Sequence, residues 1–330
     1  MQHKAPQPRT RKHALQSFAT MATTIALVVI MNLCFATTFS LGKLGLQYSG
    51  PLFLLGLRMI FGGSILLTYY IIHTPRAEWR SIARKDWFLT IKIILFYNVL
   101  SYVLEFWALQ YMSPLKTTML WSSLPFVSAL LGYFLLQETL TPLKWWGLLI
   151  GTAGMVPVML IPDERTTAIG GFFSISLPEM AMFVEVVAYA YGGYLAKRIF
   201  DKGYSIMLIN GWCLLLGGGA MIFTRLCMIP IDPQISSAYM PTIGYALVLA
   251  LVSEVIGYGI YGVLLKRKYT ITFLNFSGFL CPIFAAAISN LVFQESLDYK
   301  YALAFLLILL GLFLFYREEL AQEIETLEIA

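Results

Sequence analysis

Apolar stretches of about the length needed to cross a bilayer follow one another along almost the whole chain. A helix needs about 20 mainly apolar residues to span about 30 Å of hydrocarbon. Charged residues, prolines and glycines divide the sequence into ten such stretches. We predict transmembrane helices at Thr20–Gly42, Pro51–His73, Trp87–Gln110, Ser113–Leu136, Leu143–Ile161, Pro178–Ile199, Gly203–Arg225, Pro241–Leu265, Ile271–Phe293 and Tyr301–Tyr316.

The composition requires that much of the surface faces lipid. Hydrophobic residues make up 58% of the chain and charged residues 12%, with a mean hydropathy of +0.73. A soluble domain carries about 25% charged residues. The formal net charge is only +5, and no basic stretch is mixed with aromatic residues as a nucleic-acid groove requires. We therefore expect an all-α integral membrane protein in contact with the lipid bilayer, with no nucleic-acid partner.

Lysine and arginine are distributed unevenly between the two ends of the predicted helices. With a cytoplasmic N-terminus and alternating helices, one side of the membrane holds 16 basic residues and the other holds five. The sparse side carries Lys43, Lys116, Arg165, Arg225 and Lys300. Cytoplasmic loops are enriched in Lys and Arg. This distribution predicts ten spans with both termini cytoplasmic, and it fits a bacterial inner (cytoplasmic) membrane, with a eukaryotic organelle left open.

One pattern in the sequence recurs 157 residues further along the chain. Pro125 is followed twelve residues later by Gln-Glu-Thr-Leu, starting at Gln137, and Pro282 is followed at the same spacing by Gln-Glu-Ser-Leu, starting at Gln294. Five spans per half is an odd number, so the second half must enter the membrane inverted. Inverted repeats are characteristic of secondary transporters, whose site lies near the midplane between the halves. Both prolines lie within predicted helices, where they favour kinks that can act as matched hinges.

The repeat also predicts the domain organisation. We expect a cytoplasmic N-terminal tail at 1–19, a first five-helix repeat at 20–161, an external linker at 162–177, a second five-helix repeat at 178–316 and an acidic cytoplasmic tail at 317–330.

Two glutamates, Glu138 and Glu295, mark the exits of the matched helices. With the segments Phe39–Leu66 and Pro125–Gly154 and their counterparts in the second half, they resemble the EamA-type, ten-helix branch of the drug/metabolite transporter superfamily. The glutamates stand where that family has a G-E-x-L element, although glutamine replaces the glycine here. The resemblance extends from about Thr20 to Tyr316 and implies the fold and a transport function, but hardly the substrate.

Arg58 and Glu105 are two ionisable residues inside predicted spans. An ionisable residue in the hydrocarbon costs roughly 2.5–3.5 kcal/mol on insertion scales, so it needs a partner or a wet cavity. At 1.5 Å per residue, both lie roughly 8–10 Å from the outer ends of their helices. We expect them to form an ion pair. Either Arg58 holds a substrate carboxylate, with Glu105 as counter-charge or gate, or the pair only joins two helices.

Glu185 and Glu254 are two further carboxylates, and Glu254 lies near the predicted midplane. No basic residue of their own helices lies at a comparable depth. Each can bind a substrate ammonium group or carry the proton of a coupled cycle, and each can instead be protonated and hydrogen-bonded in helix packing. Tyr189 and Tyr258, on the same two helices, are candidates to line a cavity beside them.

Asparagines complete the set of candidate polar residues. Asn32 and Asn275 can orient a polar ligand, as can Asn98 and Asn210, but each can equally make an interhelical hydrogen bond, which we favour for most of them. The four cysteines show no metal-ligand spacing, and no histidine lies inside a span. We therefore expect neither a metal nor a cofactor.

A secondary active transporter working by alternating access is the function that these features favour. An arginine with several carboxylates and tyrosines suits an amino acid or another zwitterion. The alternatives are an adenosyl amino acid such as S-adenosylmethionine, which some relatives of the resembled family take up, and a cationic drug. Coupling to a proton or a counter-substrate, and a monomer or a homodimer, are all left open.

A membrane-embedded enzyme, a channel and a scaffold are the readings from other functional classes. All five aspartates lie in predicted loops, and no serine stands in a G-x-S-G nucleophile motif. We therefore expect no enzymatic activity. The sequence also shows no ring of like charges and no repeated filter loop that would support a channel.

Overall fold

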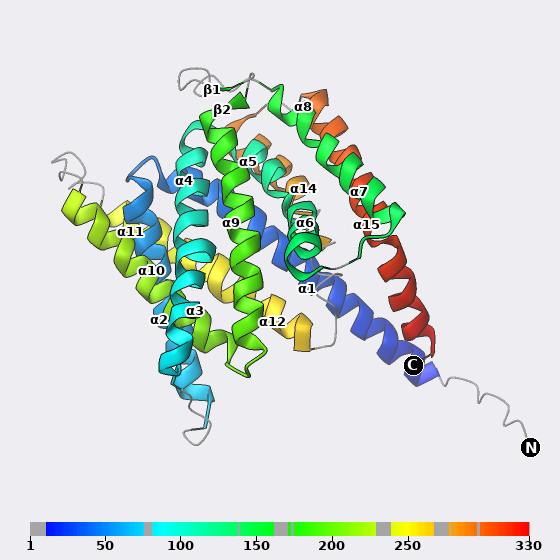
Figure 1. Ribbon diagram of the computed structural model, residues 1–330, viewed down its shortest axis with the longest axis horizontal. Coiled ribbons are helices and arrows are strands. Elements are labelled where there is room, and N and C mark those ends of the chain that lie inside the picture. Colours follow the sequence, from blue (N-terminus) through cyan, green and yellow to red (C-terminus); the bar gives the residue numbers. More distant parts are fainter. Residues whose placement is uncertain are drawn as a thin grey trace, which may run out of the picture.

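The computed structural model of the chain describes residues 11–75, 81–137, 139–161, 171–172, 175–228, 239–266, 277–278, 280–295 and 298–329. This part is built almost entirely of helices (Figure 1). The described strands, β1 (Gly171–Phe172) and β2 (Ile175–Ser176), form an antiparallel pair in which Gly171 lies opposite Ser176.

The helices follow the predicted apolar stretches. The first part of the chain forms α1 (Arg11–Gly45), α2 (Pro51–His73), the 3-10 helix η2 (Arg84–Asp86), α3 (Trp87–Ile93), the π-helix η3 (Ile94–Leu100), α4 (Ser101–Tyr111), α5 (Pro114–Trp121), α6 (Leu124–Leu136), α7 (Pro142–Ala153) and α8 (Met155–Met159). The second part forms α9 (Leu177–Phe200), α10 (Ile206–Met228), α11 (Tyr239–Leu249), the π-helix η5 (Ala250–Gly257), α12 (Tyr258–Lys266), α14 (Leu280–Phe293) and α15 (Tyr299–Ile329).

Within the described residues, seven helical segments are long and apolar enough to cross a membrane. They are Ala22–Gly45, Pro51–His73, Arg84–Tyr111, Pro114–Leu135, Ile206–Cys227, Tyr239–Leu264 and Tyr299–Arg317. The predicted all-α membrane fold is thus confirmed. The other predicted spans coincide with α7 and α8, with α9 and with α14, which fall outside this set. The count of ten spans therefore stays a prediction.

Helix α9 begins with strong local signals. The backbone N–H of Ser176 donates to Oε2 of Glu179 at 2.6 Å, which is the bond that the third residue of the helix supplies in a capping box. Pro178 follows in the first turn, where its fixed φ suits a helix and no N–H is needed. These signals place the start of α9 firmly, and with it Glu185 and Tyr189 further along the helix.

Helices α2 and α10 pack closely and run antiparallel. A Cβ atom added to Gly56 would lie 3.1 Å from the carbonyl oxygen of Gly218, and one added to Gly218 would lie 2.8 Å from the carbonyl oxygen of Gly56. Gly63 likewise faces the carbonyl oxygen of Gly211 at 2.8 Å. Small residues let membrane helices approach this closely. Helices α7 and α15 form a second pair through Gly147, and Figure 1 shows them side by side, away from α2 and α10.

Unusual backbone features occur at matched positions in the two parts of the chain. Gln137 ends α6 with φ 56°, and Gln294, 157 residues later, follows α14 with φ 54°. These are the non-glycine residues with positive φ in the described part of the chain. The π-helices η3 and η5 are also separated by this offset to within one residue. The left-handed conformation explains why glycine would suit the positions of Gln137 and Gln294.

The predicted hinge prolines lie at the starts of helical segments. Helix α5 ends at Trp121, residues 122–123 form a turn, and Pro125 lies in the first turn of α6. The fourth predicted span is therefore broken just before Pro125. Pro282 lies in the first turn of α14, and residues 271–276 before it are outside the described part of the chain.

Lysines of the sparsely basic side contact helix ends. The Nζ atom of Lys43 donates to the carbonyl oxygen of Leu109 at 2.6 Å, near the end of α4. The Nζ atoms of Lys116 and Lys300 donate to the last carbonyls after α8, at 2.7 and 3.0 Å. A cation at a helix C-terminus satisfies carbonyls that have no partner within the helix. These lysines therefore hold the ends of α4 and α8 in place.

Candidate functional site

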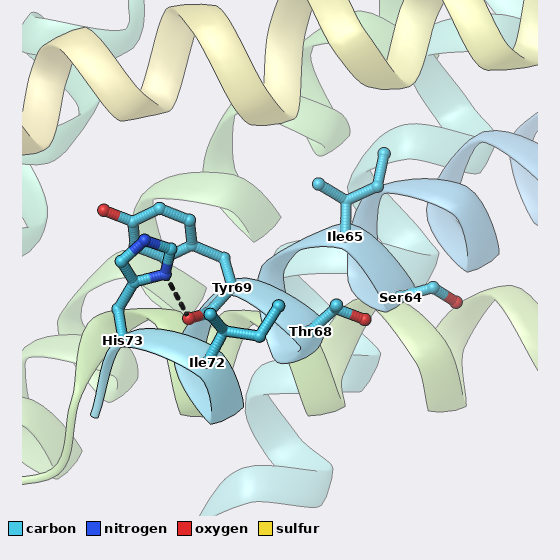
Figure 2. A pocket seen from close by; sticks show the side chains of 6 residues that line it. All are labelled: Ser64, Ile65, Thr68, Tyr69, Ile72 and His73. Atoms are coloured by element: carbon cyan, nitrogen blue, oxygen red, sulfur yellow. Dashed lines mark hydrogen bonds between the residues drawn. The ribbon is translucent and has the colours of Figure 1, made fainter. Parts of the chain in front are cut away.

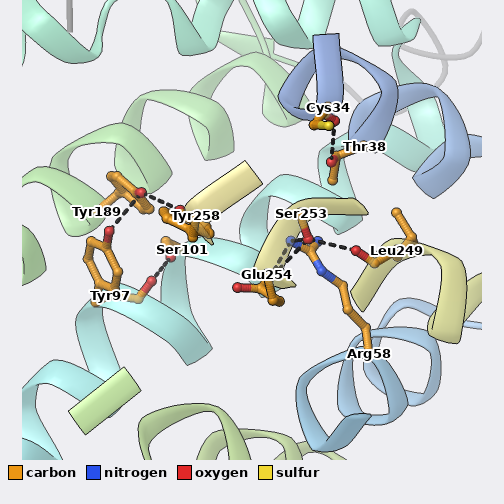
Figure 3. A network of polar contacts seen from close by, with 10 residues as sticks. All are labelled: Cys34, Thr38, Arg58, Tyr97, Ser101, Tyr189, Leu249, Ser253, Glu254 and Tyr258. Atoms are coloured by element: carbon orange, nitrogen blue, oxygen red, sulfur yellow. Dashed lines mark hydrogen bonds and ion pairs between the residues drawn. The ribbon is translucent and has the colours of Figure 1, made fainter. Parts of the chain in front are cut away.

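A buried ion pair joins α2 to the π-helix η5. The Nη2 atom of Arg58 lies 3.0 Å from Oε1 of Glu254, and both side chains are nearly inaccessible (Figure 3). The same Nη2 atom donates to Oγ of Ser253 at 3.0 Å, and this hydroxyl lies 2.7 Å from the carbonyl oxygen of Leu249. The prediction that Arg58 pairs with Glu105 is wrong, because Glu254 of another helix is its partner.

The π-helix accounts for part of this error. A π-helical turn holds more residues than an α-helical one, so it changes which side chains after it face a neighbour. Glu254 lies within such a segment. Depth along an ideal helix therefore matched Arg58 with the wrong carboxylate, because depth does not report which helix faces which.

Only one of the three guanidinium nitrogens of Arg58 has a hydrogen-bond partner within the described residues. Its Nε and Nη1 atoms are buried and have no hydrogen-bond partner within the described residues. Its Cζ atom lies 5.0 Å from the ring centre of Tyr102 and 5.6 Å from that of Phe106. The aromatic rings stabilise the cation. The two unused nitrogens lie on different edges of the guanidinium plane, and each can donate a hydrogen bond to a further acceptor such as a carboxylate oxygen.

Glu105 and Glu185 bring two more carboxylates into the same region. Glu105 lies in α4 and is 5% exposed, while Glu185 lies in α9 and is completely buried. Both carboxyl oxygens of Glu185 lack a hydrogen-bond partner in the described structure. Helix α4 packs against both α2 and α9, and the ring of Phe106, the residue after Glu105, lies 5.6 Å from Cζ of Arg58. We call Arg58, Glu105, Glu185 and Glu254 the interior charged cluster.

Tyr97, Tyr189 and Tyr258 form a line of hydroxyl groups beside the cluster. The hydroxyl of Tyr97 donates to that of Tyr189 at 2.8 Å, and the hydroxyls of Tyr189 and Tyr258 lie 2.9 Å apart (Figure 3). The rings of Tyr97 and Tyr189 are stacked with their centres 4.4 Å apart. Phe35 and Trp121 meet Tyr258 and Tyr189 edge-on. We call these five residues the aromatic cluster.

Tyr97 was not among the predicted site residues. It lies in η3, whose contact with α9 brings it onto Tyr189. Tyr97 lies 157 residues before Glu254, a residue of the other π-helix. The repeat offset therefore pairs Tyr97 with a predicted site residue and could have identified it.

The asparagine predictions have different outcomes. The Nδ2 atom of Asn32 donates to the carbonyl oxygen of Val28 at 2.9 Å and to Oγ of Ser277 at 3.3 Å, so this side chain joins two helices. Asn98 is buried in η3, and its Oδ1 atom has no partner within the described residues. Asn275 lies outside the described part of the chain.

Of the two glutamates that mark the repeat, Glu295 belongs to the described residues. Glu138 falls outside the described residues, whereas the carbonyl oxygen of Glu295 accepts a hydrogen bond from Nδ2 of Asn290 at 3.1 Å. Glu295 is therefore tied to the end of α14.

A shallow pocket lies elsewhere, on the outside of α2. It measures about 350 Å³ and is lined by Ser64, Ile65, Thr68, Tyr69, Ile72 and His73 (Figure 2). Tyr69 and His73 stack there with their ring centres 4.0 Å apart. Ile72 is 70% exposed, as expected for a side chain that faces lipid. Aromatic residues at a helix end are typical of the membrane interface, so this pocket is distinct from the interior site.

Comparisons with known proteins agree with a membrane transporter. Residues 22–160 match the EamA-like transporter family. The chain is 26% identical over 308 residues to a protein of Chlamydia trachomatis named S-adenosylmethionine/S-adenosylhomocysteine transporter, with 90% of each chain covered. The protein of the same name in Chlamydia muridarum is also 26% identical over 308 residues, covering 90% of this chain and 93% of that one.

More distant matches also cover most of the chain. A WAT1-related chloroplastic protein of Arabidopsis thaliana is 25% identical over 260 residues, covering 76% of this chain and 59% of that one. A crystal structure superposes with a TM-score of 0.61 at 18% identity, covering 92% of this chain and 99% of the other, and it supports the fold alone. These matches support a transporter of the EamA type rather than an enzyme, with the family match covering residues 22–160. The chain is a multi-pass membrane protein.

Proposed function

We propose that this chain is a secondary transporter of an amino-acid derivative that carries an adenosyl group, such as S-adenosylmethionine. The ligand would bind at the interior charged cluster and the aromatic cluster. This binding site would be open first to one side of the membrane and then to the other. The names of the Chlamydia relatives favour this derivative over a plain amino acid, the class that the sequence first suggested.

The partly unused guanidinium of Arg58 is the observation that carries the proposal. An arginine deep in a membrane protein is expensive unless each of its donors is used. Here two donor nitrogens point at no acceptor in the described structure. A ligand carboxylate could accept from one of these nitrogens and a second ligand acceptor from the other, because Nε–H and Nη1–H lie on different edges of the guanidinium plane. In a purely structural ion pair we would expect the protein itself to supply acceptors.

The other ligand groups find matching chemistry nearby. Glu105 and Glu185 carry the negative charge that an ammonium or sulfonium group needs. The rings of Tyr97, Tyr189 and Trp121 offer flat surfaces for stacking an adenine. The hydroxyls of the three tyrosines can also hydrogen-bond to ring nitrogens.

We further propose ten spans in two inverted repeats, at 20–161 and 178–316. The positive φ of Gln137 and Gln294 and the matched π-helices support equivalent halves. The antiparallel contact between Gly56 and Gly218 and between Gly63 and Gly211 supports inversion, because the second and seventh spans run in opposite directions only if each half has an odd number of spans. Both termini are then cytoplasmic, in an inner (cytoplasmic) membrane.

Exchange across proteoliposomes tests the proposed substrate. Vesicles loaded with S-adenosylhomocysteine would take up radiolabelled S-adenosylmethionine, and unlabelled S-adenosylmethionine outside would compete while methionine and adenosine would compete weakly. The matched variant is Arg58→Lys, which keeps the charge but loses the planar fork. Its uptake should fall at least tenfold while its melting temperature shows that it remains folded.

Other outcomes would redirect the assignment. Competition by methionine alone would return the substrate to plain amino acids. Uptake of lipophilic cations that is insensitive to Arg58→Lys would favour drug transport and leave Arg58 as a structural residue. No uptake of any of these ligands by folded protein would overturn the proposed function.

A further inference from the structure

The interior charged cluster has an excess of negative groups. It contains one arginine, Arg58, and three glutamates, Glu105, Glu185 and Glu254, so its formal charge is −2 when all four are ionised. Each of these residues is at most 5% exposed. Uncompensated charge in such surroundings is very unfavourable, and a buried group neutralises instead. The cluster therefore holds protons or other cations whenever no ligand supplies positive charge.

Glu185 is the member that most needs a proton or a cation. Glu254 already has Arg58 at 3.0 Å, whereas both oxygens of Glu185 lack a partner in the described structure and the residue is 0% exposed. Buried Met182 and Ala181 lie on the same helix. An ionised carboxylate could persist at this position only beside a positive ligand group.

The charged groups around α9 leave Glu105 as the main influence on Glu185. The elements that pack most closely on α9 are α3, η3, α4, α5, α6 and β2, and their titratable side chains are Lys92, Tyr97, Tyr102, Glu105, Tyr111, Lys116 and Tyr133. Lys116 is bound to Glu179 at 2.7 Å, and Lys92 lies over the ring of Phe88. Glu105 is the carboxylate on these elements, and a like charge nearby disfavours the ionised form of Glu185.

We infer that Glu185 is a proton-exchange site that distinguishes ligands by charge: a cationic ligand releases its proton, and a ligand with one positive charge fewer leaves the proton in place. This inference rests on the proposed function. A sulfonium nucleoside amino acid has a net charge of +1, and its thioether product has a net charge of 0. The two differ by one methyl group and one charge. In an exchange cycle, the sulfonium ligand would then be carried with Glu185 ionised and the thioether with Glu185 protonated. The summed charge of ligand and Glu185 would be the same in both directions.

Binding as a function of pH tests the inference. Dissociation constants for S-adenosylmethionine and S-adenosylhomocysteine would be measured on the purified full-length protein between about pH 5 and about pH 7. Both ligands keep a protonated amino group in this range, because an α-amino group titrates near 7.7–8.0. We expect the affinity for the sulfonium ligand, relative to the thioether, to rise up to tenfold for each pH unit, the slope of one released proton.

Variants of α9 identify the residue that holds the proton. Glu185→Gln keeps the shape of the side chain and should abolish the pH dependence of the affinity ratio. Val184→Ala is the matched control, since Val184 is the adjacent residue and its side chain is 52% exposed; it should retain the full slope. A ratio that does not change with pH in the wild type, or a slope that survives in Glu185→Gln, would overturn the inference.

A second measurement does not depend on the folding of the variant. Calorimetry of the wild type in two buffers with different ionisation enthalpies counts the protons released on binding. One proton more for the sulfonium ligand than for the thioether supports the inference, and equal numbers overturn it. If neither ligand binds at any pH, the proposed function fails; if both bind with equal proton release, only the role of Glu185 fails.

Discussion

Arg58 of α2 and Glu254 of η5 form a buried ion pair of 3.0 Å between residues 196 positions apart in the sequence. Removing one partner of such a pair leaves the other charge buried alone, whereas removing both does not. We predict that Arg58→Met and Glu254→Met each destabilise the protein by about 3–5 kcal/mol and that the double variant regains most of this loss. Melting temperatures in detergent measure the cycle.

The double variant also separates structure from transport. If Arg58 serves only to join α2 and η5, the stable double variant will still bind the nucleoside ligand. We expect binding to be lost, because the guanidinium that would bind the ligand carboxylate has been removed. Additive losses of stability in the double variant would contradict the coupling itself.

Lys116 of α5 and Glu179 of α9 form a second buried pair, 2.7 Å long, with side chains 1% and 3% exposed. We predict that Lys116→Met destabilises the protein by about 3–5 kcal/mol. Lys202→Met is the control, because Lys202 pairs with Asp86 but is 48% exposed. The Asp86 side chain is only 4% exposed, but the exposed Lys202 is screened by water, so Lys202→Met should cost less than Lys116→Met. Equal shifts in melting temperature for the two variants would argue against the buried position of Lys116.

Gln137 and Gln294 adopt the left-handed conformation at the ends of α6 and α14. That conformation costs a non-glycine residue about 1–2 kcal/mol. Gln137→Gly and Gln294→Gly should therefore each stabilise the protein, by about 0.5–1 kcal/mol once the greater chain entropy of glycine is subtracted. Gln110→Gly, inside α4, should instead destabilise by about 1 kcal/mol. Thermal unfolding of the three variants would show opposite signs; a loss of stability at Gln137 or Gln294 would refute this account.

Gly218 and Gly219 are adjacent in α10 but differ in their surroundings. A Cβ at Gly218 would meet α2 at 2.8 Å, whereas a Cβ at Gly219 would meet nothing within 4 Å. Gly218→Ala should therefore lower stability by about 1–3 kcal/mol through overpacking. Gly219→Ala should raise it by up to about 1 kcal/mol through helix propensity. Melting temperatures of the pair test the contact between α2 and α10, and equal values would count against it.

The sequence predicted the helices well because the signals for them are local. Within the described residues, hydropathy and punctuation placed the predicted spans on helical segments, and the ends of the second span, Pro51 and His73, agree with α2. The offset between Gln137 and Gln294 likewise identified two positions that share an unusual backbone conformation. Apolar length, proline and repeat spacing can all be read from neighbouring residues.

The partners of the interior charges were decided by the tertiary structure alone. Depth along a helix correctly put Arg58, Glu105, Glu185 and Glu254 inside the protein, but it paired Arg58 with Glu105. Which helix faces which, and how a π-helix turns Glu254 toward α2, depend on packing between segments far apart in the chain. An ion pair needs atoms within about 4 Å. The hydropathy of a sequence does not report which side chains of different helices come that close.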